Sequence, residues 1–426
     1  MLDKDQKQSI FILSIGTFLE YFDLMLYLHL AVILNELFFP KTDPAITPLI
    51  SSAAFCTTYF FRPIGALIFG WIGDNIGRKV TVLMTILLMS LSCLLMANLP
   101  TYAQIGISAS WILIICRIIQ GMTSMGEIIG AELYLMETIK PPIQYSAVAL
   151  IEACFALGGM AALGVAAFFI TFGLNWRFAF WLGALLALVG SFARTNLRET
   201  PEFIDGRRKI RRDLELAEID ETSLNDNNIT QAKVSKKTLL ALFLLDCSWP
   251  VCFYIAYIYC GDILKDSFQF SGEQVIQQNF IVSVIEFLGA LSLVYLGGKI
   301  YPLKILKAKF VIFLPFILIC PYLFRHLRTP FDLLLIQSFI MLFGFFMSPA
   351  FPIFYRHLPV FKRFTYASLS FALSRALVYS ITSFGLIYLT KYLGNFGLLI
   401  ILIPISIGFA FGIQHFEKID NLDSRK

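Results

Sequence analysis

Charged side chains are scarce in this chain. Aspartate, glutamate, lysine and arginine make up only 15% of its 426 residues, whereas about 25% is usual in soluble proteins. Hydrophobic residues make up 58%. Apolar runs of about 20 residues, the length that crosses the hydrocarbon core of a bilayer, recur along nearly the whole sequence. The composition therefore excludes an ordinary soluble domain and predicts an all-α integral membrane protein in contact with the lipid bilayer.

Signatures of catalysis and cofactor binding are missing. The sequence has no Gly-x-x-x-x-Gly-Lys-Ser/Thr loop for ATP, and no His-Glu-x-x-His or Ser/His/Asp pattern indicates an enzyme. All eight cysteines lie in apolar runs without Cys-x-x-Cys spacing, so we expect neither zinc nor disulfides. The net charge of +5 gives no indication of nucleic-acid binding. We expect no cofactor, no metal and no nucleic-acid partner.

Polar segments divide the sequence into twelve predicted transmembrane helices. With the N-terminus in the cytoplasm, the inner loops and tails hold about four times as many lysines and arginines as the outer ones, in agreement with the positive-inside rule. The even number of spans then places both termini in the cytoplasm. The first span is too long for the apolar core of a signal peptide. The predicted spans are 10–39, 47–72, 79–99, 105–137, 146–172, 177–196, 238–261, 274–297, 304–323, 331–355, 364–390 and 394–414.

A polar segment at 194–237 separates six spans from six. It combines basic clusters with an acidic, asparagine-rich stretch, which indicates a cytoplasmic connector or a short amphipathic helix on the inner leaflet. Six plus six is the layout of transporters built from two halves, with the substrate site between them. The predicted parts are a six-helix bundle at 1–193, the linker at 194–237, a second six-helix bundle at 238–416 and a short cytoplasmic tail at 417–426.

Two carboxylates and a phenol share one face of the first span. Glu20, Asp23 and Tyr27 fall within a wedge of about 60° on a helix. Because ionised side chains at bilayer depth are costly, they predict proton or cation handling, or else a structural pair with a neighbouring arginine. Arg62 in the second span is such an arginine, and we expect it to meet Glu20, Asp23 or a substrate carboxylate.

The fourth span carries a polar stripe. Arg117, Gln120, Ser124 and Glu127 fall within a wedge of about 80°. A stripe of this length requires a cavity or polar partners inside the membrane. We interpret Arg117 as a ligand for an anionic substrate group and Glu127 as a proton carrier or a partner of a substrate cation.

The seventh span places a carboxylate beside aromatic rings. Asp246, Trp249, Phe253 and Tyr257 are predicted to share a face, an arrangement that binds quaternary ammonium groups through cation–π contact. The alternative is a chance stripe in a chain that is 15% aromatic.

Four other buried charges favour structural pairing. Glu132 and Glu137 lie off the polar stripe of the fourth span and are interpreted as partners of neighbouring helices. Glu286 and Arg375 are predicted to pair across the second half.

A short polar turn joins spans two and three. Gly70, Asp74, Gly77, Arg78 and Lys79 stand in it. Its glycines allow a sharp turn and close helix contact, its basic pair favours the cytoplasmic side, and its carboxylate suits a cation or a neighbouring helix N-terminus. A second copy at 297–304 keeps the glycines and the positive charge but lacks the aspartate.

These residues resemble the major facilitator superfamily and, within it, the metabolite:proton symporters, most closely the proline/betaine transporters. The turn departs at Asn75, where a basic residue is usual. Further departures are Ala372, where the family tends to carry asparagine, and the ten residues after Phe416, too few for a coiled-coil extension. The matching segments are Phe18–Tyr27, Arg62-Pro63-x-Gly65, Gly70–Lys79, Arg117–Glu127, Trp176–Phe180 and Leu197–Phe203.

The resemblance implies import of a small zwitterionic osmolyte driven by protons, in a bacterial cytoplasmic membrane, by a monomer. A symporter of dicarboxylates or tricarboxylates and a non-transporting sensor are the alternatives. The expected roles are proton coupling by Glu20, Asp23 and Glu127; substrate binding by Tyr27, Arg62, Arg117, Gln120, Ser124, Trp249 and Tyr257; and a conformational latch at Gly70, Asp74, Gly77, Arg78 and Lys79.

Overall fold

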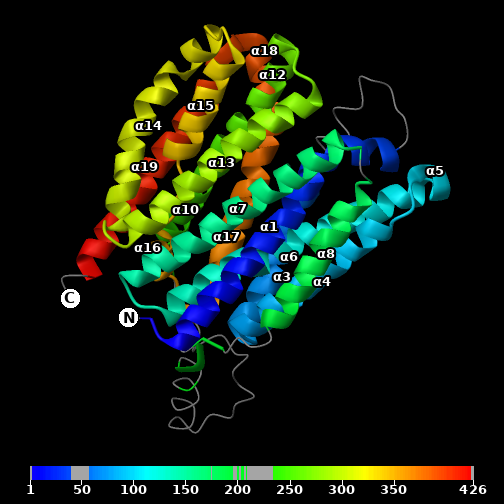
Figure 1. Cartoon of the computed structure of the whole chain (residues 1–426). Helices are drawn as coiled ribbons and strands as arrows, with labels where there is room; N and C mark the ends of the chain where they lie inside the picture. The colour runs from blue at the N-terminus through cyan, green and yellow to red at the C-terminus, as the bar shows by residue number, and fades with distance from the viewer. Residues whose placement is uncertain are drawn as a thin grey trace.

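The structure is a helical bundle with both chain ends at the same end of it, which we call the termini end (Figure 1). It is a computed structural model. Within the residues that it describes there is no β-strand. The described residues are 2–39, 57–173, 175–194, 199–200, 203–205, 208 and 234–423.

The first half follows the predicted spans one to six. Two predicted stretches, 47–56 of span two and most of the linker 194–237, lie outside the described residues. The turn between α3 and α4 lies at the termini end, and α5 lies at the opposite end (Figure 1). The helices are α1 (Lys4–Phe38), α3 (Arg62–Asn75), α4 (Arg78–Asn98), α5 (Tyr102–Ile105), α6 (Ile107–Thr138), α7 (Ile143–Thr171) and α8 (Arg177–Arg194).

The second half has six helical runs, of which two contain a π-helical segment and one is followed by a short extra helix. The last helix continues through most of the predicted tail. The elements are α10 (Lys236–Asp246), α11 (Ser248–Phe253), η2 (Tyr254–Tyr259) and α12 (Cys260–Phe268) in the first run, then α13 (Gly272–Gly297), α14 (Pro302–Arg325), α15 (Pro330–Phe343) with α16 (Phe351–Tyr355), α17 (Val360–Ser380) with η3 (Ile381–Gly385), α18 (Leu386–Leu393) and η4 (Gly394–Phe396), and finally α19 (Gly397–Asp423).

The described helices expose apolar side chains and bury polar ones. Leu87, Leu91, Trp111 and Ile115 are exposed along α4 and α6, where lipid tails would surround them. Seven continuous helical stretches are long and apolar enough to cross a membrane, and α15 is a shorter apolar helix. The buried charges therefore lie inside the bundle, where they must find partners in the protein.

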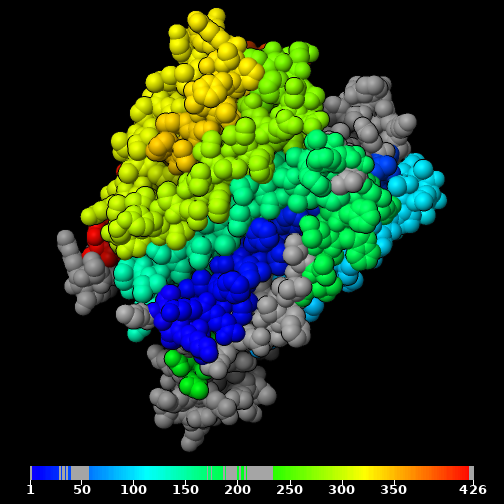
Figure 2. All heavy atoms as spheres, in the orientation of Figure 1, coloured from blue at the N-terminus to red at the C-terminus, as the bar shows by residue number. Residues whose placement is uncertain are grey.

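Helices of the two halves pack directly against each other. α7 lies along α13, and α3 lies along α17; the contact of α7 with α13 is visible on the face in Figure 2. Glycine permits one of these approaches, because a Cβ atom at Gly70 of α3 would lie 2.8 Å from Cα of Thr365 in α17. Polar side chains between these helix pairs therefore belong to the interface of the two halves.

Candidate functional site

The predicted faces of α1 and α6 meet inside the first half. The Arg117 guanidinium lies 3.9 Å from the ring centroid of Tyr27 and donates a hydrogen bond to Gln120 Oε1 at 2.9 Å. Gln120 in turn donates to the Cys93 thiol at 3.3 Å. The structure thus brings together three residues that the sequence analysis placed on two separate helices.

Asp23 is buried and lies beside the Cys93 thiol. It is 1% exposed, and Cys93 is within hydrogen-bonding range of its carboxylate. A Cβ atom at Gly183 of α8 would lie 2.0 Å from Asp23 Oδ1, so the glycine makes the room that this carboxylate occupies. Glu20, one turn earlier, is also buried. Two buried carboxylates on one helix suit the proton-handling hypothesis.

The remainder of the α6 stripe makes helix contacts. Glu127 accepts a hydrogen bond from Thr85 of α4 at 2.7 Å, and Ser124 donates to the carbonyl of Gly121 at 2.8 Å within its own helix. A neutral hydroxyl of α4 therefore orients the Glu127 carboxylate.

Arg62 does not make the ion pair predicted for it. In the described part of the chain it pairs with neither Glu20 nor Asp23; its guanidinium lies 4.4 Å from the ring centroid of Tyr59, and its Nε and Nη2 atoms have no hydrogen-bond partner. Tyr59 stacks at 4.4 Å on Tyr379 from the second half. Because α1 and α3 are different helices, spacing along the sequence cannot give their relative rotation.

The four residues of the predicted face of the seventh span have different partners. Asp246 accepts a hydrogen bond from Ser370 at 2.5 Å, and Trp249 packs on Phe346 at 4.7 Å. The rings of Phe253 and Tyr257 lie 4.9 Å apart, centroid to centroid. α10 ends at Asp246, and η2 (Tyr254–Tyr259) is a π-helix; both changes alter the rotation per residue.

The predicted pair of Glu286 and Arg375 does not form. Glu286 accepts a hydrogen bond from the Tyr257 hydroxyl at 2.6 Å. Arg375 lies over the Phe371 ring at 3.1 Å and interacts electrostatically with Asp246 and Glu152. The sequence analysis missed Glu152, because it is a single charge in the apolar stretch of α7.

Two adjoining cavities lie between the halves. The first is lined by Glu152, Trp249, Glu286 and Lys309 among others. The second shares Glu152 and Trp249 and adds Arg375. Both signs of charge and an aromatic ring therefore border one internal space.

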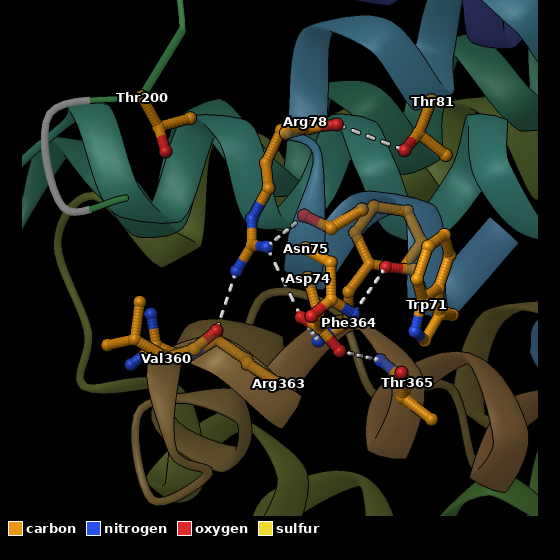
Figure 3. Close-up of polar contacts among 12 residues, drawn as sticks. Trp71, Asp74, Asn75, Arg78, Thr81, Thr200, Val360, Arg363, Phe364 and Thr365 are labelled. Atoms are coloured by element: carbon orange, nitrogen blue, oxygen red, sulfur yellow. Dashed lines mark hydrogen bonds and ion pairs between the residues drawn. The ribbon is translucent and has the colours of Figure 1, made fainter. Parts of the chain in front are cut away.

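The turn between α3 and α4 binds the start of α17 (Figure 3). The Asp74 carboxylate accepts backbone N–H groups from Phe364 at 3.1 Å and Thr365 at 2.9 Å, in the second turn of α17. The predicted contact of this carboxylate with a neighbouring helix start is confirmed, and the same carboxylate pairs with Arg78 at 3.2 Å. One side chain thus holds the two halves together at the termini end.

Arg78 extends this contact. It is fully buried, donates to the Val360 carbonyl of α17 at 2.8 Å and pairs with Glu137 of α6 at 3.2 Å. Glu137 also pairs with Arg363 of α17 at 3.0 Å. The predicted helix-to-helix pairing of Glu137 is confirmed. The sequence analysis did not foresee that its partners would be Arg78 of the turn and Arg363 of α17.

Glycine and a distant glutamate shape the turn itself. Gly77 has a φ of 146°, a region that favours glycine. Glu199 accepts the backbone N–H groups of Arg78 at 3.0 Å and Lys79 at 3.3 Å, and so caps α4. Lys79 contributes this backbone contact. Glu199 stands in a segment that the sequence analysis quoted without assigning it a role.

The second copy of the turn also reaches the opposite half. A Cβ at Gly298 would lie 2.8 Å from Ser146 Oγ of α7, and Ser146 donates to the Val294 carbonyl of α13 at 2.9 Å. Without the aspartate, this contact is a single neutral hydrogen bond between α7 and α13.

Known proteins share both the sequence pattern and the fold. The "Putative proline/betaine transporter" of Staphylococcus aureus (strain COL) is 35% identical over 208 residues, 47% of this chain and 45% of the relative. The "Proline/betaine transporter" of Salmonella typhimurium (strain LT2) is 31% identical over 210 residues, 47% of this chain and 42% of the relative. The chain therefore matches less than half the length of these curated relatives.

Solved structures resemble the whole bundle. The proton:xylose symporter XylE bound to 6-bromo-6-deoxy-D-glucose aligns with a TM-score of 0.77 and 15% identity, over 96% of this chain and 95% of that one. The human organic anion transporter MFSD10 (TETRAN) aligns with a TM-score of 0.63 and 14% identity, over 96% and 100%. This likeness concerns the fold: twelve transmembrane helices in two six-helix halves. The family model described as Major Facilitator Superfamily matches residues 13–356, and the chain belongs to this superfamily.

Proposed function

We propose that this protein is a proton-coupled symporter that imports a small zwitterion such as proline or glycine betaine. The observation that carries the proposal is the internal space between the halves, bordered by Glu152 and Glu286, by Trp249, and by Arg375. An ammonium group fits carboxylates and an aromatic face, and a substrate carboxylate fits the guanidinium. The names of the partial relatives support the same substrate class.

Dicarboxylates are the weaker candidate. A dianion needs cationic neighbours on both ends, whereas two glutamates border the space that it would enter. Arg62 and Arg117, which the sequence analysis matched to anionic substrate groups, lie over the rings of Tyr59 and Tyr27. Desolvating a second carboxylate beside Glu152 and Glu286 would be costly.

We place the termini end in the cytoplasm of a bacterium, so that the latch closes the inner side of the transporter. Closing one side while the other opens is how two packed states alternate access to a central site. Protons serve as the coupling ion, with Asp23, Glu20 and Glu127 as carriers, and the monomer is the working unit.

The test uses the full chain in proteoliposomes. We expect labelled proline to accumulate when a proton gradient is imposed, and unlabelled betaine to compete better than 2-oxoglutarate. Equal uptake with the gradient collapsed would refute proton coupling, and stronger competition by 2-oxoglutarate would assign the dicarboxylate class.

Trp249 provides the variant for substrate recognition. Losing a cation–π contact of about 0.5–2 kcal/mol should raise the half-saturating concentration in Trp249→Ala by roughly 2- to 30-fold. Trp111→Ala on the exposed face of α6 is the matched control. Identical saturation curves for the two variants would remove Trp249 from the binding site.

A further inference from the structure

Two glutamates from neighbouring helices lie in contact inside the bundle. Glu132 of α6 and Glu152 of α7 are within hydrogen-bonding and electrostatic range of each other. Glu132 is fully buried and Glu152 is 4% exposed. Neither belongs to the proposed proton carriers, and Glu132 was predicted to pair with a neighbouring helix.

The pair has one neutral donor beside it, the hydroxyl of Tyr355. This hydroxyl lies within hydrogen-bonding range of Glu132 and is 1% exposed. Ionised carboxylates accept hydrogen bonds but cannot donate them, and two ionised carboxylates at one site repel each other. A single proton between Glu132 and Glu152 supplies a donor from one carboxylate to the other and removes the repulsion.

The surrounding charges do not neutralise the pair. Arg375 is shared between Glu152 and Asp246, and Asp246 is itself one of the acidic neighbours of Glu132. Glu286 adds a further negative charge near Glu152. The groups that face the pair are Asp246 of α10, Glu286 of α13, Lys309 of α14, Tyr355 of α16 and Arg375 of α17.

The pair has access to the internal space through one of its members. Glu152 lines both cavities, and Glu132 lies behind it. Water that enters between the halves therefore reaches Glu152 first, and this water is the acceptor for a proton that leaves the pair.

We propose that Glu132 and Glu152 form a proton-binding site, which holds one shared proton while the termini end is closed and releases it to water when the halves separate. Hydration of Glu152 in the open state lets both carboxylates ionise. The coupling role of this proton rests on the proposed symport function, whereas its presence in the closed state does not.

Infrared spectroscopy of the full chain in lipid tests the shared proton. Wild type at neutral pH should have a deuterium-sensitive C=O band of protonated carboxylic acid. Glu132→Gln and Glu152→Gln should each reduce this band by one acid, and the double variant should reduce it no further. Asp266→Asn, on the exposed outer part of α12, should leave it unchanged. The proposal is overturned if the band is unreduced in both single variants. It is also overturned if the wild-type protein lacks the band and binds radioactive sodium instead.

Transport assays test the coupling role separately. In proteoliposomes with labelled proline and betaine, Glu132→Gln, whose side chain lines neither cavity, should keep exchange of the probe across the membrane and lose accumulation driven by a proton gradient. Full gradient-driven accumulation in Glu132→Gln overturns the coupling role. If wild type moves neither probe, the proposed function fails, while the infrared difference still decides whether the shared proton exists.

Discussion

Replacing Asp74 by asparagine should open the termini end. Asp74 accepts two backbone N–H groups of α17, and asparagine has the same shape but only one acceptor oxygen. The variant thus loses about one hydrogen bond to a charged group, worth roughly 1.5–3 kcal/mol. At about 1.36 kcal/mol per factor of ten, the ratio of closed to open molecules should fall roughly 10- to 150-fold.

A buried cysteine introduced in α17 reports this change. Ser368 is fully buried in α17 and follows Phe364 and Thr365 on the same helix face. In a Ser368→Cys background, a membrane-impermeant maleimide added from the termini side should react faster by the same factor, as long as the open state is the minor one. The same protein without Ser368→Cys gives the background of the native cysteines.

Asp332 is the matched control. Its carboxylate also accepts two backbone N–H groups, from Arg328 at 3.0 Å and Thr329 at 2.9 Å, but these belong to the start of its own helix. Asp332→Asn should therefore leave the labelling rate of the introduced cysteine unchanged. Equal rates in Asp74→Asn and the parent protein would refute the assignment of Asp74 as a latch, because a latch that loses one of these two bonds cannot hold α17 as tightly.

Two glycines allow further tests. In Gly77→Ala the new Cβ would lie 2.1 Å from Glu199 Oε2, so the labelling rate should rise and the unfolding temperature should fall. Gly106→Ala is the control for backbone strain, because Gly106 is also at positive φ but has nothing within 4 Å of the new Cβ. An equal fall of the unfolding temperature in both variants would exclude a role for the Glu199 contact. In Gly183→Ala the Cβ would displace the Asp23 carboxylate, so gradient-driven uptake should be lost in a protein that still folds, and normal uptake would remove Asp23 from the proton pathway.

Sequence patterns predicted contacts within regular helices well. Arg117 and Gln120 lie one turn apart on α6, and the wheel placed them together because this helix is uninterrupted. Asp74 was matched to a helix start by its chemistry alone. Which helix it would meet was not predictable, because Phe364 and Thr365 are about 290 residues away in the chain.

The errors have physical causes as well. The rule that buried charges pair with opposite charges paired Glu286 with Arg375. Burial also permits a phenol as the partner of a carboxylate, as in the bond of Tyr257 to Glu286. A single sequence does not distinguish these partners, because each of them lowers the free-energy cost of burying a charged side chain.

The unequal copies of the turn have a kinetic consequence. When α3 separates from α17, the buried Asp74 carboxylate loses its backbone N–H donors. The Arg78 guanidinium also loses the carbonyl to which it donates. Beside the second copy of the turn, separation of α7 from α13 breaks one hydrogen bond, from the Ser146 hydroxyl. The activation barrier for opening the termini end is therefore concentrated on one edge of the bundle. Substitutions along that edge should therefore change the opening rate, whereas substitutions at the Ser146 edge should change it little.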